Sequence, residues 1–398
     1  MCGIAGELRF GAQPSQADWE SISKLMIRRG PDDAGAWQDA HCTLVFRRLS
    51  ILDLSPAGHQ PMVSDDGRYV LVFNGEVYNF VELRRQLEQR GIRFRSGTDS
   101  EVVLYALATW GRDALDRFNG MFALAFYDTR ERTLLLARDH AGIKPLYYLK
   151  HADGLVFGSQ YDQLLAHPWS RGLSFSPAAA SLYFHLGSVP APWGILENTG
   201  MLEAGSWLEV RGEGTISQGC YYAFPRYQPA SLRGGEAMEA VDAAITRAVK
   251  RQLVSDVPIG AFLSGGIDSP LVCAKMQQAC GNNMRAFTIG TGGDATDESQ
   301  DAIRYAQALG IEQTVEHVEP DDAVDMLDDV VAACGEPLGD FSIFPTLLVS
   351  RLARRDFTVM LSGDGGDELF WGYSRRVGAL MSGLGDFRHS RRWRRAMR

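Results

Sequence analysis

The chain contains few cysteines, and none has a spacing typical of a disulfide framework or a metal site. Its six cysteines are scattered among 398 residues, with no C-x-x-C pair and no H-E-x-x-H motif. A disulfide-rich fold and a structural zinc site are therefore not expected. We interpret the cysteines after position 2 as small buried apolar side chains, namely Cys42, Cys220, Cys273, Cys280 and Cys334.

Long apolar runs and an excess of basic residues are also missing. No apolar run approaches the ~20 residues that a membrane-spanning helix needs, and no basic segment followed by an apolar one opens the chain. The formal net charge of -9 disfavours nucleic acid as the main partner, because phosphate binding requires an excess of Lys and Arg. We therefore expect a cytoplasmic protein, and we interpret the arginine-rich tail 388–398 as a solvated helix face or frayed end rather than a nucleic-acid arm.

The pattern of predicted elements changes along the chain and indicates two domains. Residues 1–215 contain short strand-like runs and two helices, about 81–90 and 99–111, which suggests an α+β layered fold. Glu101 follows Thr98 by three residues and predicts a capping box. After a linker at 216–235, residues 236–398 alternate strands and helices, which predicts a doubly wound parallel sheet. The predicted strands are 44–47, 69–73, 121–127, 133–137, 259–263, 285–289, 313–318 and 357–361, and the later helices are 299–309, 321–334 and 345–355.

The first candidate for chemistry is the thiol of Cys2. Removal of Met1 would leave a free α-amine on the same residue, and an α-amine has a pKa of about 7.7–8.0. That amine can accept the thiol proton, so one residue supplies both nucleophile and general base. A thiol that attacks an amide also needs an oxyanion hole, for which the Asn74 side chain and the Gly75 N–H are candidates. The alternative reading of Asn74-Gly75 is an ordinary turn.

Two glycine-rich segments follow predicted strands in the second domain. Leu263-Ser264-Gly265-Gly266-Ile267-Asp268-Ser269 lies between a strand and a helix, where backbone N–H groups form an anion site. It lacks the Walker pattern. Ser362-Gly363-Asp364-Gly365-Gly366-Asp367-Glu368 follows the strand ending at Leu361, and ligands bind at such strand ends. Its acids form either a solvated turn or a Mg²⁺ site.

Several motifs in order resemble a known family. Residues 2–6, 29–33, 48–53, 58–62, 74–76 and 97–101 are similar to the class II glutamine amidotransferase domain, an N-terminal-nucleophile hydrolase with an αββα sandwich. They resemble glutamine-hydrolysing asparagine synthetases more closely, and the loop at 263–269 looks like the pyrophosphate loop of ATP pyrophosphatases. One departure is Arg28, where the family usually has His.

This resemblance implies a role for each matching residue. Arg48 would bind the α-carboxylate of glutamine, Glu76 and Asp99 its α-ammonium group, and Asn74 and Gly75 the oxyanion. Asp268 and Asp367 would lie near Mg²⁺, and Asp364 occupies a position linked to formation of the acyl-adenylate. The implied ATP-binding residues are Leu263, Ser264, Gly265, Gly266, Asp268, Ser269, Ile289, Ser362 and Gly363.

The expected activity is that of an ATP-dependent, glutamine-hydrolysing asparagine synthase. Aspartate would be adenylated and then amidated by ammonia released at Cys2. One alternative is an enzyme on the same scaffold that amidates another carboxylate, and another is a ring-closing relative that needs no ammonia, against which Cys2 argues. A third is a shortened chain with only a glutaminase or binding role, because relatives continue with a helical segment that includes a catalytic Lys. The oligomeric state stays open, with a homodimer among the alternatives.

Overall fold

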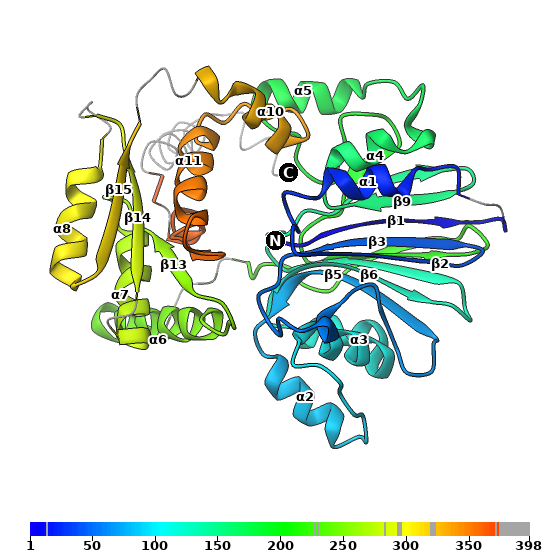
Figure 1. The fold of residues 1–398 in the computed structure, drawn as a ribbon, viewed down its shortest axis with the longest axis horizontal. Coiled ribbons are helices and arrows are strands. Elements are labelled where there is room, and N and C mark those ends of the chain that lie inside the picture. The colour runs from blue at the N-terminus through cyan, green and yellow to red at the C-terminus, as the bar shows by residue number, and fades with distance from the viewer. Residues whose placement is uncertain are drawn as a thin grey trace, which may run out of the picture. The chain divides into compact units, whose positions relative to one another are not determined.

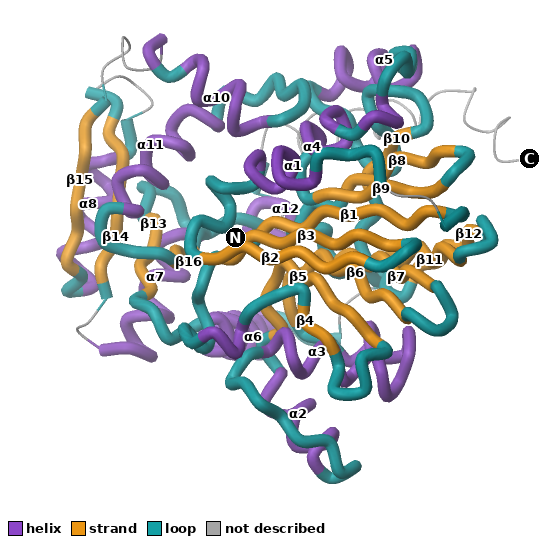
Figure 2. The backbone as a smooth tube through the Cα atoms, turned by 45° about the vertical axis from the view of Figure 1, so that its right-hand side comes forward, coloured by secondary structure: helices purple, strands orange, loops and turns teal. Residues whose placement is uncertain are grey.

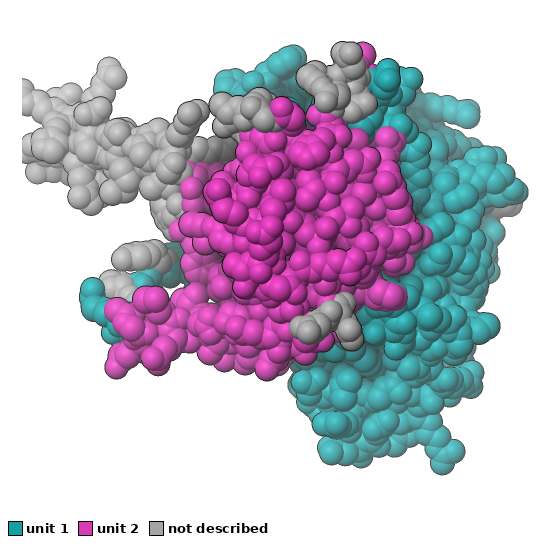
Figure 3. Space-filling view, turned by 60° about the vertical axis from the view of Figure 1, so that its left-hand side comes forward, with its two compact units in different colours: residues 1–233, 254–257, 325–344 teal, residues 234–253, 258–324, 345–398 magenta. Residues whose placement is uncertain are grey.

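The computed structural model describes residues 1–373 except 13–14, 227, 229–230, 282–283, 293–296, 319–323 and 371. The arginine-rich tail therefore lies outside the described residues. The chain divides into two compact units (Figure 3). Unit 1 comprises Met1–Arg233, Val254–Val257 and Asp325–Phe344, and unit 2 comprises Gly234–Leu253, Pro258–Val324 and Pro345–Arg398. Two short segments from the second half of the chain thus pack with unit 1.

Unit 1 contains two six-stranded sheets (Figures 1 and 2). The first has the order β10 (Thr199–Met201), β8 (Tyr147–His151), β9 (Gly154–Gly158), β1 (Gly3–Arg9), β3 (Cys42–Arg48), β2 (Asp33–Gln38). The second has the order β12 (Ile216–Cys220), β11 (Ser206–Arg211), β7 (Thr133–Arg138), β6 (Gly120–Asp128), β5 (Tyr69–Val77), β4 (Met62–Val63). Neighbouring strands in both sheets pair antiparallel.

Helices cover the outer face of each sheet (Figure 1). On the first sheet lie α1 (Trp19–Leu25), α4 (Tyr161–Ala166) and α5 (Pro177–Leu186), and on the second lie α2 (Phe80–Glu88) and α3 (Asp99–Trp110). The largest core cluster joins side chains of the two facing sheets, including Ile4, Phe46 and Tyr127. A second cluster joins β5 and β6 to α2 and α3. These layers are the predicted αββα sandwich, and alternating buried faces explain why two sheets can share one core.

The start of α3 agrees with its predicted cap but not with the full capping box. Thr98 Oγ1 accepts the N–H of Glu101 at 3.2 Å, as the sequence predicts. The Glu101 carboxylate does not return to the Thr98 N–H, as a capping box requires. It accepts the N–H groups of Arg95 and Ser96, at 2.9 and 2.7 Å, so the reciprocal half of the prediction is wrong. The Glu101 carboxylate thus accepts two backbone N–H groups of the loop before the helix instead of the single N–H of a capping box.

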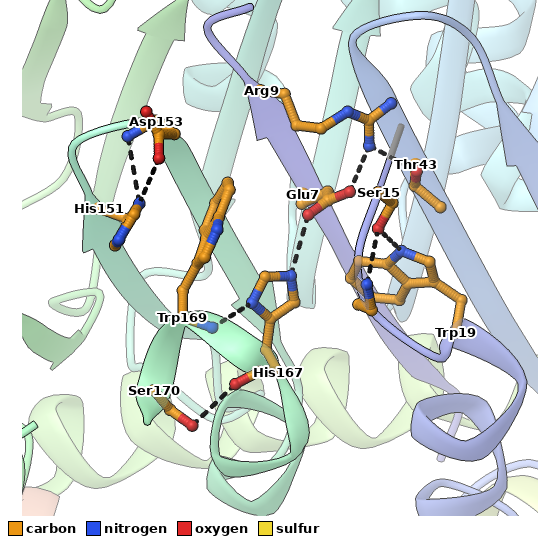
Figure 4. A network of polar contacts seen from close by, with 11 residues as sticks. Glu7, Arg9, Ser15, Trp19, Thr43, His151, Asp153, His167, Trp169 and Ser170 are labelled. Atoms are coloured by element: carbon orange, nitrogen blue, oxygen red, sulfur yellow. Dashed lines mark hydrogen bonds and ion pairs between the residues drawn. The ribbon is translucent and has the colours of Figure 1, made fainter. Parts of the chain in front are cut away.

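A buried polar network crosses the first sheet of unit 1 (Figure 4). The Glu7 carboxylate contacts Arg9 on one side and His167 Nε2 at 2.9 Å on the other. Arg9 also donates to Thr43 Oγ1 at 3.0 Å, and the Trp169 N–H donates to His167 Nδ1 at 3.2 Å. Because Nδ1 accepts, the imidazole proton lies on Nε2 and faces the carboxylate. Burial alone would raise the pKa of Glu7, but hydrogen bonds and the positive charge of Arg9 lower this pKa below its ordinary value.

Unit 2 is built around a four-stranded parallel sheet with the order β15 (Glu312–His317), β14 (Arg285–Gly290), β13 (Ile259–Phe262), β16 (Val359–Leu361). Its helices are α6 (Gly234–Gln252), α7 (Asp268–Cys280), α8 (Ser299–Leu309), α11 (Ile343–Arg354) and the short α12 (Gly366–Phe370). The chain runs outward from β13 to β15 and then returns to the other side of β13. That reversal is a topological switch point, where ligands bind in open parallel sheets.

Some sequence predictions need correction. Cys220 and Cys280 are exposed and Cys334 is only partly buried, so only Cys42 and Cys273 behave as buried apolar side chains. Within the predicted helix 321–334, α10 spans Leu327–Cys334, residues 324 and 325 are also helical, and residues 321–323 lie outside the described part of the chain. Among the described residues, no helix is both long and apolar enough to cross a membrane.

Candidate functional site

Cys2 lies immediately before β1, which is fixed on both sides. The N–H of Ile4 donates to Ser159 Oγ at 3.0 Å, and the N–H of Ser159 donates to the Ile4 carbonyl at 2.9 Å. The thiol of Cys2 accepts the N–H of Leu49 at 3.4 Å. These contacts hold the candidate nucleophile at the end of a buried strand, which is the rigid support that a reactive group needs.

Cys2 is partly buried, and the pKa values of its thiol and of the neighbouring amine are both shifted. Burial raises the pKa of the Cys2 thiol, while the positive N-terminus and the Leu49 hydrogen bond oppose that rise. Burial lowers the pKa of the Met1 α-ammonium group to about 5. An amine in this position is therefore neutral at pH 7 and can accept a proton. After removal of Met1 the amine would sit on Cys2 itself, which matches the predicted thiol–amine pair.

Asn74 and Gly75 lie on β5, opposite Ala123 and Phe122 of β6. Asn74 is fully buried, and neither its Oδ1 nor its Nδ2 has a hydrogen-bond partner among the described residues. A buried polar group without a partner costs about 1–3 kcal/mol, so such a side chain calls for a functional explanation. At Gly75 a Cβ atom would collide with the Met121 carbonyl, so only glycine fits this strand position. A side-chain amide without hydrogen-bond partners, next to a position that only glycine can occupy, fits the predicted oxyanion hole.

Glu76 and Asp99 form an acidic pair beside these residues. Asp99 accepts the N–H of Val77 at 2.8 Å, which ties the start of α3 to the end of β5. Burial raises the pKa of Glu76, and the negative charge of Asp99 raises it further. Burial likewise raises the pKa of Asp99, against the hydrogen bonds from backbone N–H groups. Two carboxylates that repel each other in a shielded site favour a bound cation, as the predicted α-ammonium contact requires.

Arg48 is buried at the end of β3, and its guanidinium head supports the loop that follows. It donates to the carbonyl oxygens of Ser55 at 2.9 Å, Leu52 at 3.2 Å and Asp53 at 2.5 Å. A guanidinium group carries five N–H donors, so two remain for a carboxylate. Gly58 is required here, because a Cβ at this position would collide with Arg48 Nη2. Arg48 therefore both shapes the site and keeps donors available.

Cys2, Arg48, Gly75, Glu76 and Asp99 line one small pocket in unit 1, whereas Asn74 is not among its lining residues. Its volume is about 30 Å³, which is closer to a water molecule than to an amino acid. The lining residues are Cys2, Phe46, Arg48, Leu49, Ile51, Leu52, Gly58, Gln60, Phe73, Gly75, Glu76, Thr98, Asp99 and Ser100. A larger groove of about 320 Å³, between α3 and strands β6, β7 and β11, contains none of the predicted site residues.

Two site residues in unit 1 were missed by the sequence analysis. Lys144 is buried, burial lowers its pKa, and the Glu76 carboxylate opposes this lowering. Leu49 contacts the thiol through its backbone, which no side-chain pattern reveals. The unusual Arg28 forms an ion pair with Asp329 at 3.3 Å on the surface. Arg28 therefore serves the packing of the segment Asp325–Phe344 rather than the pocket.

In unit 2, the loop after β13 folds back on itself ahead of α7. The N–H of Ser264 donates to Ser269 Oγ at 2.9 Å, and the two hydroxyl groups lie 2.9 Å apart. The N–H of Gly265 donates to Glu298 Oε2 at 3.1 Å. The Glu298 carboxylate thus accepts an N–H group that a bound phosphate would use. Sequence reasoning did not predict Glu298 at this loop. Thr288 Oγ1 binds the Leu263 carbonyl at 2.7 Å, which joins β14, the strand of Ile289, to the start of the loop.

The second glycine-rich segment lies beside this loop because β16 pairs with β13. A Cβ at Gly363 would lie 2.6 Å from the Ser269 nitrogen, and one at Gly366 would collide with the Asp268 carboxylate. Burial raises the pKa of Asp268, and the charges of Asp367 and Glu368 raise it further. The structure therefore brings together the two predicted loops and their acids. Ser362 Oγ donates to Asp364 Oδ2 at 2.8 Å.

The predicted Mg²⁺ ligands were tested against this geometry. Among the described residues, no cluster of three or more His, Cys, Asp or Glu side chains could hold a metal alone. Mg²⁺ usually takes only one or two carboxylates and completes its coordination with water and substrate phosphates. The mutual repulsion of Asp268 and Asp367 beside a backbone anion site fits that type of donor set.

Comparison with known proteins identifies two domains in the chain. Residues 1–222 match the family model described as a glutamine amidotransferase domain, and residues 240–398 match the asparagine synthase model. A putative glutamine-hydrolysing asparagine synthetase 2 of Methanocaldococcus jannaschii is 35% identical over 396 residues, covering 94% of this chain and 76% of that protein. The chain belongs to the glutamine-hydrolysing asparagine synthetase family.

Other members of the family are longer than this chain. Glutamine-hydrolysing asparagine synthetase 1 of Bacillus subtilis is 33% identical over 378 residues, covering 94% of this chain and 59% of the relative. A putative member from Mycobacterium tuberculosis H37Rv is 35% identical over 398 residues, covering 94% and 60%. The chain thus spans about three fifths of these two relatives.

Proposed function

We propose that this member of the family hydrolyses glutamine at Cys2 and uses the released ammonia to amidate an adenylated carboxylate, with aspartate as the acceptor. The glutaminase reaction is assigned to residues 1–215 and the ATP-dependent reaction to residues 236–398, joined by residues 216–235. The names of the relatives support aspartate and glutamine as substrates. The observation that carries the first half is the buried, unsatisfied amide of Asn74 next to Gly75, which lines the same pocket as Cys2.

The glutaminase step follows from the residues of the pocket. The Cys2 thiol passes its proton to the neutral α-amine and attacks the side-chain amide carbon of glutamine. Asn74 Nδ2 and the Gly75 N–H stabilise the oxyanion that forms. The amine returns the proton to the departing nitrogen, and ammonia leaves a thioester on Cys2. Water then hydrolyses the thioester and releases glutamate.

The two ends of glutamine are recognised by opposite charges. The remaining N–H donors of Arg48 suit the α-carboxylate, and the Glu76–Asp99 pair suits the α-ammonium group. The buried Lys144 limits the net negative charge of this pocket. A substrate that carries both charges at one carbon fits, whereas a simple amide lacks the groups that these residues bind.

The ATP-dependent step is assigned to the paired loops of unit 2. A carboxylate oxygen of the acceptor attacks the α-phosphorus of ATP and displaces pyrophosphate, which gives an acyl-adenylate. Ammonia then attacks the acyl carbon and displaces AMP. Backbone N–H groups of Gly265 and Gly266 would hold the phosphates, with Ser264 and Ser269 beside them. Mg²⁺ held by Asp268 and Asp367 would neutralise charge on the pyrophosphate. Ser362, Gly363 and Asp364 would face the adenylate.

The first experiment measures glutamate and AMP from the chain with an unmodified N-terminus, in the presence of ATP, Mg²⁺ and glutamine, with and without aspartate. AMP that depends on aspartate supports the complete proposal. Glutamate without AMP limits the activity to a glutaminase or points to another carboxylate acceptor. No glutamate under any condition contradicts the assignment of Cys2.

Two variants separate the half-reactions. Cys2→Ala should abolish glutamine hydrolysis while AMP formation with ammonium salts continues. Asp268→Ala should block AMP formation while glutaminase activity persists. Loss of both reactions in either variant, with the protein still folded by circular dichroism, would contradict the division of labour between the two units.

A further inference from the structure

One part of the wall of the Cys2 pocket is formed by the loop Leu49–Ser55. Leu49 contacts the thiol through its backbone, and Ile51 and Leu52 line the pocket. The pocket volume of about 30 Å³ is set by how closely this loop lies against β1 and β5. Whatever fixes the loop therefore fixes the space that a bound glutamine can occupy.

Two contacts that hold the loop in place come from residues in the first hundred of the chain. The Arg48 guanidinium group donates hydrogen bonds to the carbonyl oxygens of Leu52, Asp53 and Ser55. The Asp53 carboxylate accepts the N–H of Gly97 at 2.6 Å, two residues before Asp99. Its hydrogen bonds with Ser55 and Gly97 lower the pKa of Asp53, so this carboxylate stays charged near neutral pH. The loop and the acidic pair are thus joined through Asp53.

A third support comes from Asp256, which is 203 residues further along the chain. Its backbone N–H donates to the Ile51 carbonyl at 3.0 Å, and its Oδ2 accepts the N–H of Asp53 at 2.7 Å. One residue therefore binds the loop at two points that flank Leu52. Ser255 Oγ bonds the N–H and carbonyl of Val257, at 3.1 and 2.9 Å, and fixes the turn that presents Asp256.

The backbone of Asp53 shows why this support matters. Its φ is +51°, in the left-handed region that non-glycine residues seldom adopt. Such a conformation persists only where its surroundings hold it. The Asp256 carboxylate accepts a hydrogen bond from the N–H of Asp53, so it directly holds the residue that has the unusual φ. Without that acceptor, an extended conformation at Asp53 would draw Ile51 and Leu52 away from the pocket.

We infer that Asp256 is a positioning residue for glutamine, supplied to the pocket by the segment Val254–Val257. This segment packs with unit 1, although the chain on both sides of it, α6 and β13, belongs to unit 2. The same β13 leads into the loop at Ser264. The glutaminase pocket is therefore completed by a residue outside the glutaminase sequence. The inference rests on the proposed function, because it assumes that the pocket binds glutamine.

The expected effect is on glutamine affinity rather than on the chemical step. Cys2 lies immediately before β1, and Asn74 and Gly75 lie on β5, so their backbone positions are set by these strands rather than by Ile51 and Asp53, where Asp256 binds the loop. Loss of a charge-assisted hydrogen bond at a partly exposed site lowers the population of the correctly placed loop. We expect KM for glutamine to rise about tenfold in Asp256→Ala, which corresponds to about 1.4 kcal/mol. We expect kcat to change by less than about threefold.

Three substitutions test this by steady-state glutamate release over a range of glutamine concentrations. Asp256→Ala removes the acceptor, Asp256→Asn retains an amide oxygen that can accept the Asp53 N–H, and Asp66→Ala is the matched control. Asp66 is also an exposed acid of a unit 1 turn, where it accepts the Arg68 N–H at 3.1 Å, but it lines no part of the pocket. We expect a raised KM for Asp256→Ala alone, with near-normal values for Asp256→Asn and Asp66→Ala.

The inference is overturned if KM is unchanged in a folded Asp256→Ala protein, or if kcat falls while KM stays constant. It is equally overturned if Asp66→Ala raises KM as much. Should Asp256→Ala fail to fold, Asp256→Ser, whose shorter side chain cannot reach Asp53, gives the same comparison. Failure of the proposed function is distinguishable, because the unaltered protein would then release no glutamate.

Discussion

Substitution of Asn74 tests whether this residue serves activity at a cost in protein stability. Its side chain is fully buried, and both its polar atoms lack partners among the described residues. We therefore predict that Asn74→Leu, an apolar residue of similar size, makes unit 1 more stable and less active. Each unsatisfied group costs about 1–3 kcal/mol, and a partial misfit of the branched side chain subtracts from the gain. A net stabilisation of about 1–2 kcal/mol should raise Tm by about 2–4 °C per kcal/mol.

The same substitution removes a donor to the oxyanion. Loss of one such donor typically costs about 10²–10³ in kcat, so glutamate release should fall by that factor with little change in KM. The assays are thermal unfolding followed by circular dichroism and steady-state glutaminase kinetics. Asn79→Leu is the control, because Asn79 Nδ2 donates to the Arg117 carbonyl and its Oδ1 accepts the Asn119 N–H, both at 2.9 Å. If both variants lose stability equally, or Asn74→Leu keeps its activity, the assignment of Asn74 is wrong.

Two further predictions concern unit 1. Glu7→Gln should destabilise the protein by about 3 kcal/mol at pH 7, because it leaves the buried Arg9 without its countercharge. Since the pKa of Glu7 is lowered in the folded state, its contribution is present above the ordinary carboxylate pKa and is lost as the pH falls through the lower folded value. Urea unfolding should therefore show a flatter acid dependence in the variant, and parallel curves would contradict this. Gly75→Ala should lower both stability and glutamate release, because its Cβ would meet the Met121 carbonyl; normal kinetics would show that β5 tolerates the displacement.

The sequence proposes some glutaminase residues from local patterns, at Cys2 and Asn74-Gly75, and others only from family resemblance, at Arg48, Glu76 and Asp99. Cys2 is the residue that Met1 removal would expose, and Asn74-Gly75 is a dipeptide whose glycine is forced by the neighbouring strand β6. Four strands of unit 1, namely β3, β5, β6 and β7, were predicted within a few residues of their observed bounds, since their apolar runs are distinct, whereas the other eight strands of its two sheets were not predicted. Thr98 was recognised as a cap because capping depends on residues three apart.

Other features depend on partners far along the chain. Glu298 reaches the N–H of Gly265 across 33 residues, and no spacing rule links them. Cys220 ends an edge strand, where apolar character does not guarantee burial.

Asp256 shows that the segment matching a family domain does not include every residue that supports the site. Residues 1–222 match the glutamine amidotransferase model, and that range contains every side chain proposed to touch glutamine. The loop that encloses those side chains is nevertheless held at Ile51 and Asp53 by a residue beyond that range. A protein cut after residue 222 would keep the nucleophile, the oxyanion donors and the charged pair, yet it would lose one of the three supports of the pocket wall. Glutaminase activity in such a fragment should therefore show a raised KM, for the same physical reason as Asp256→Ala.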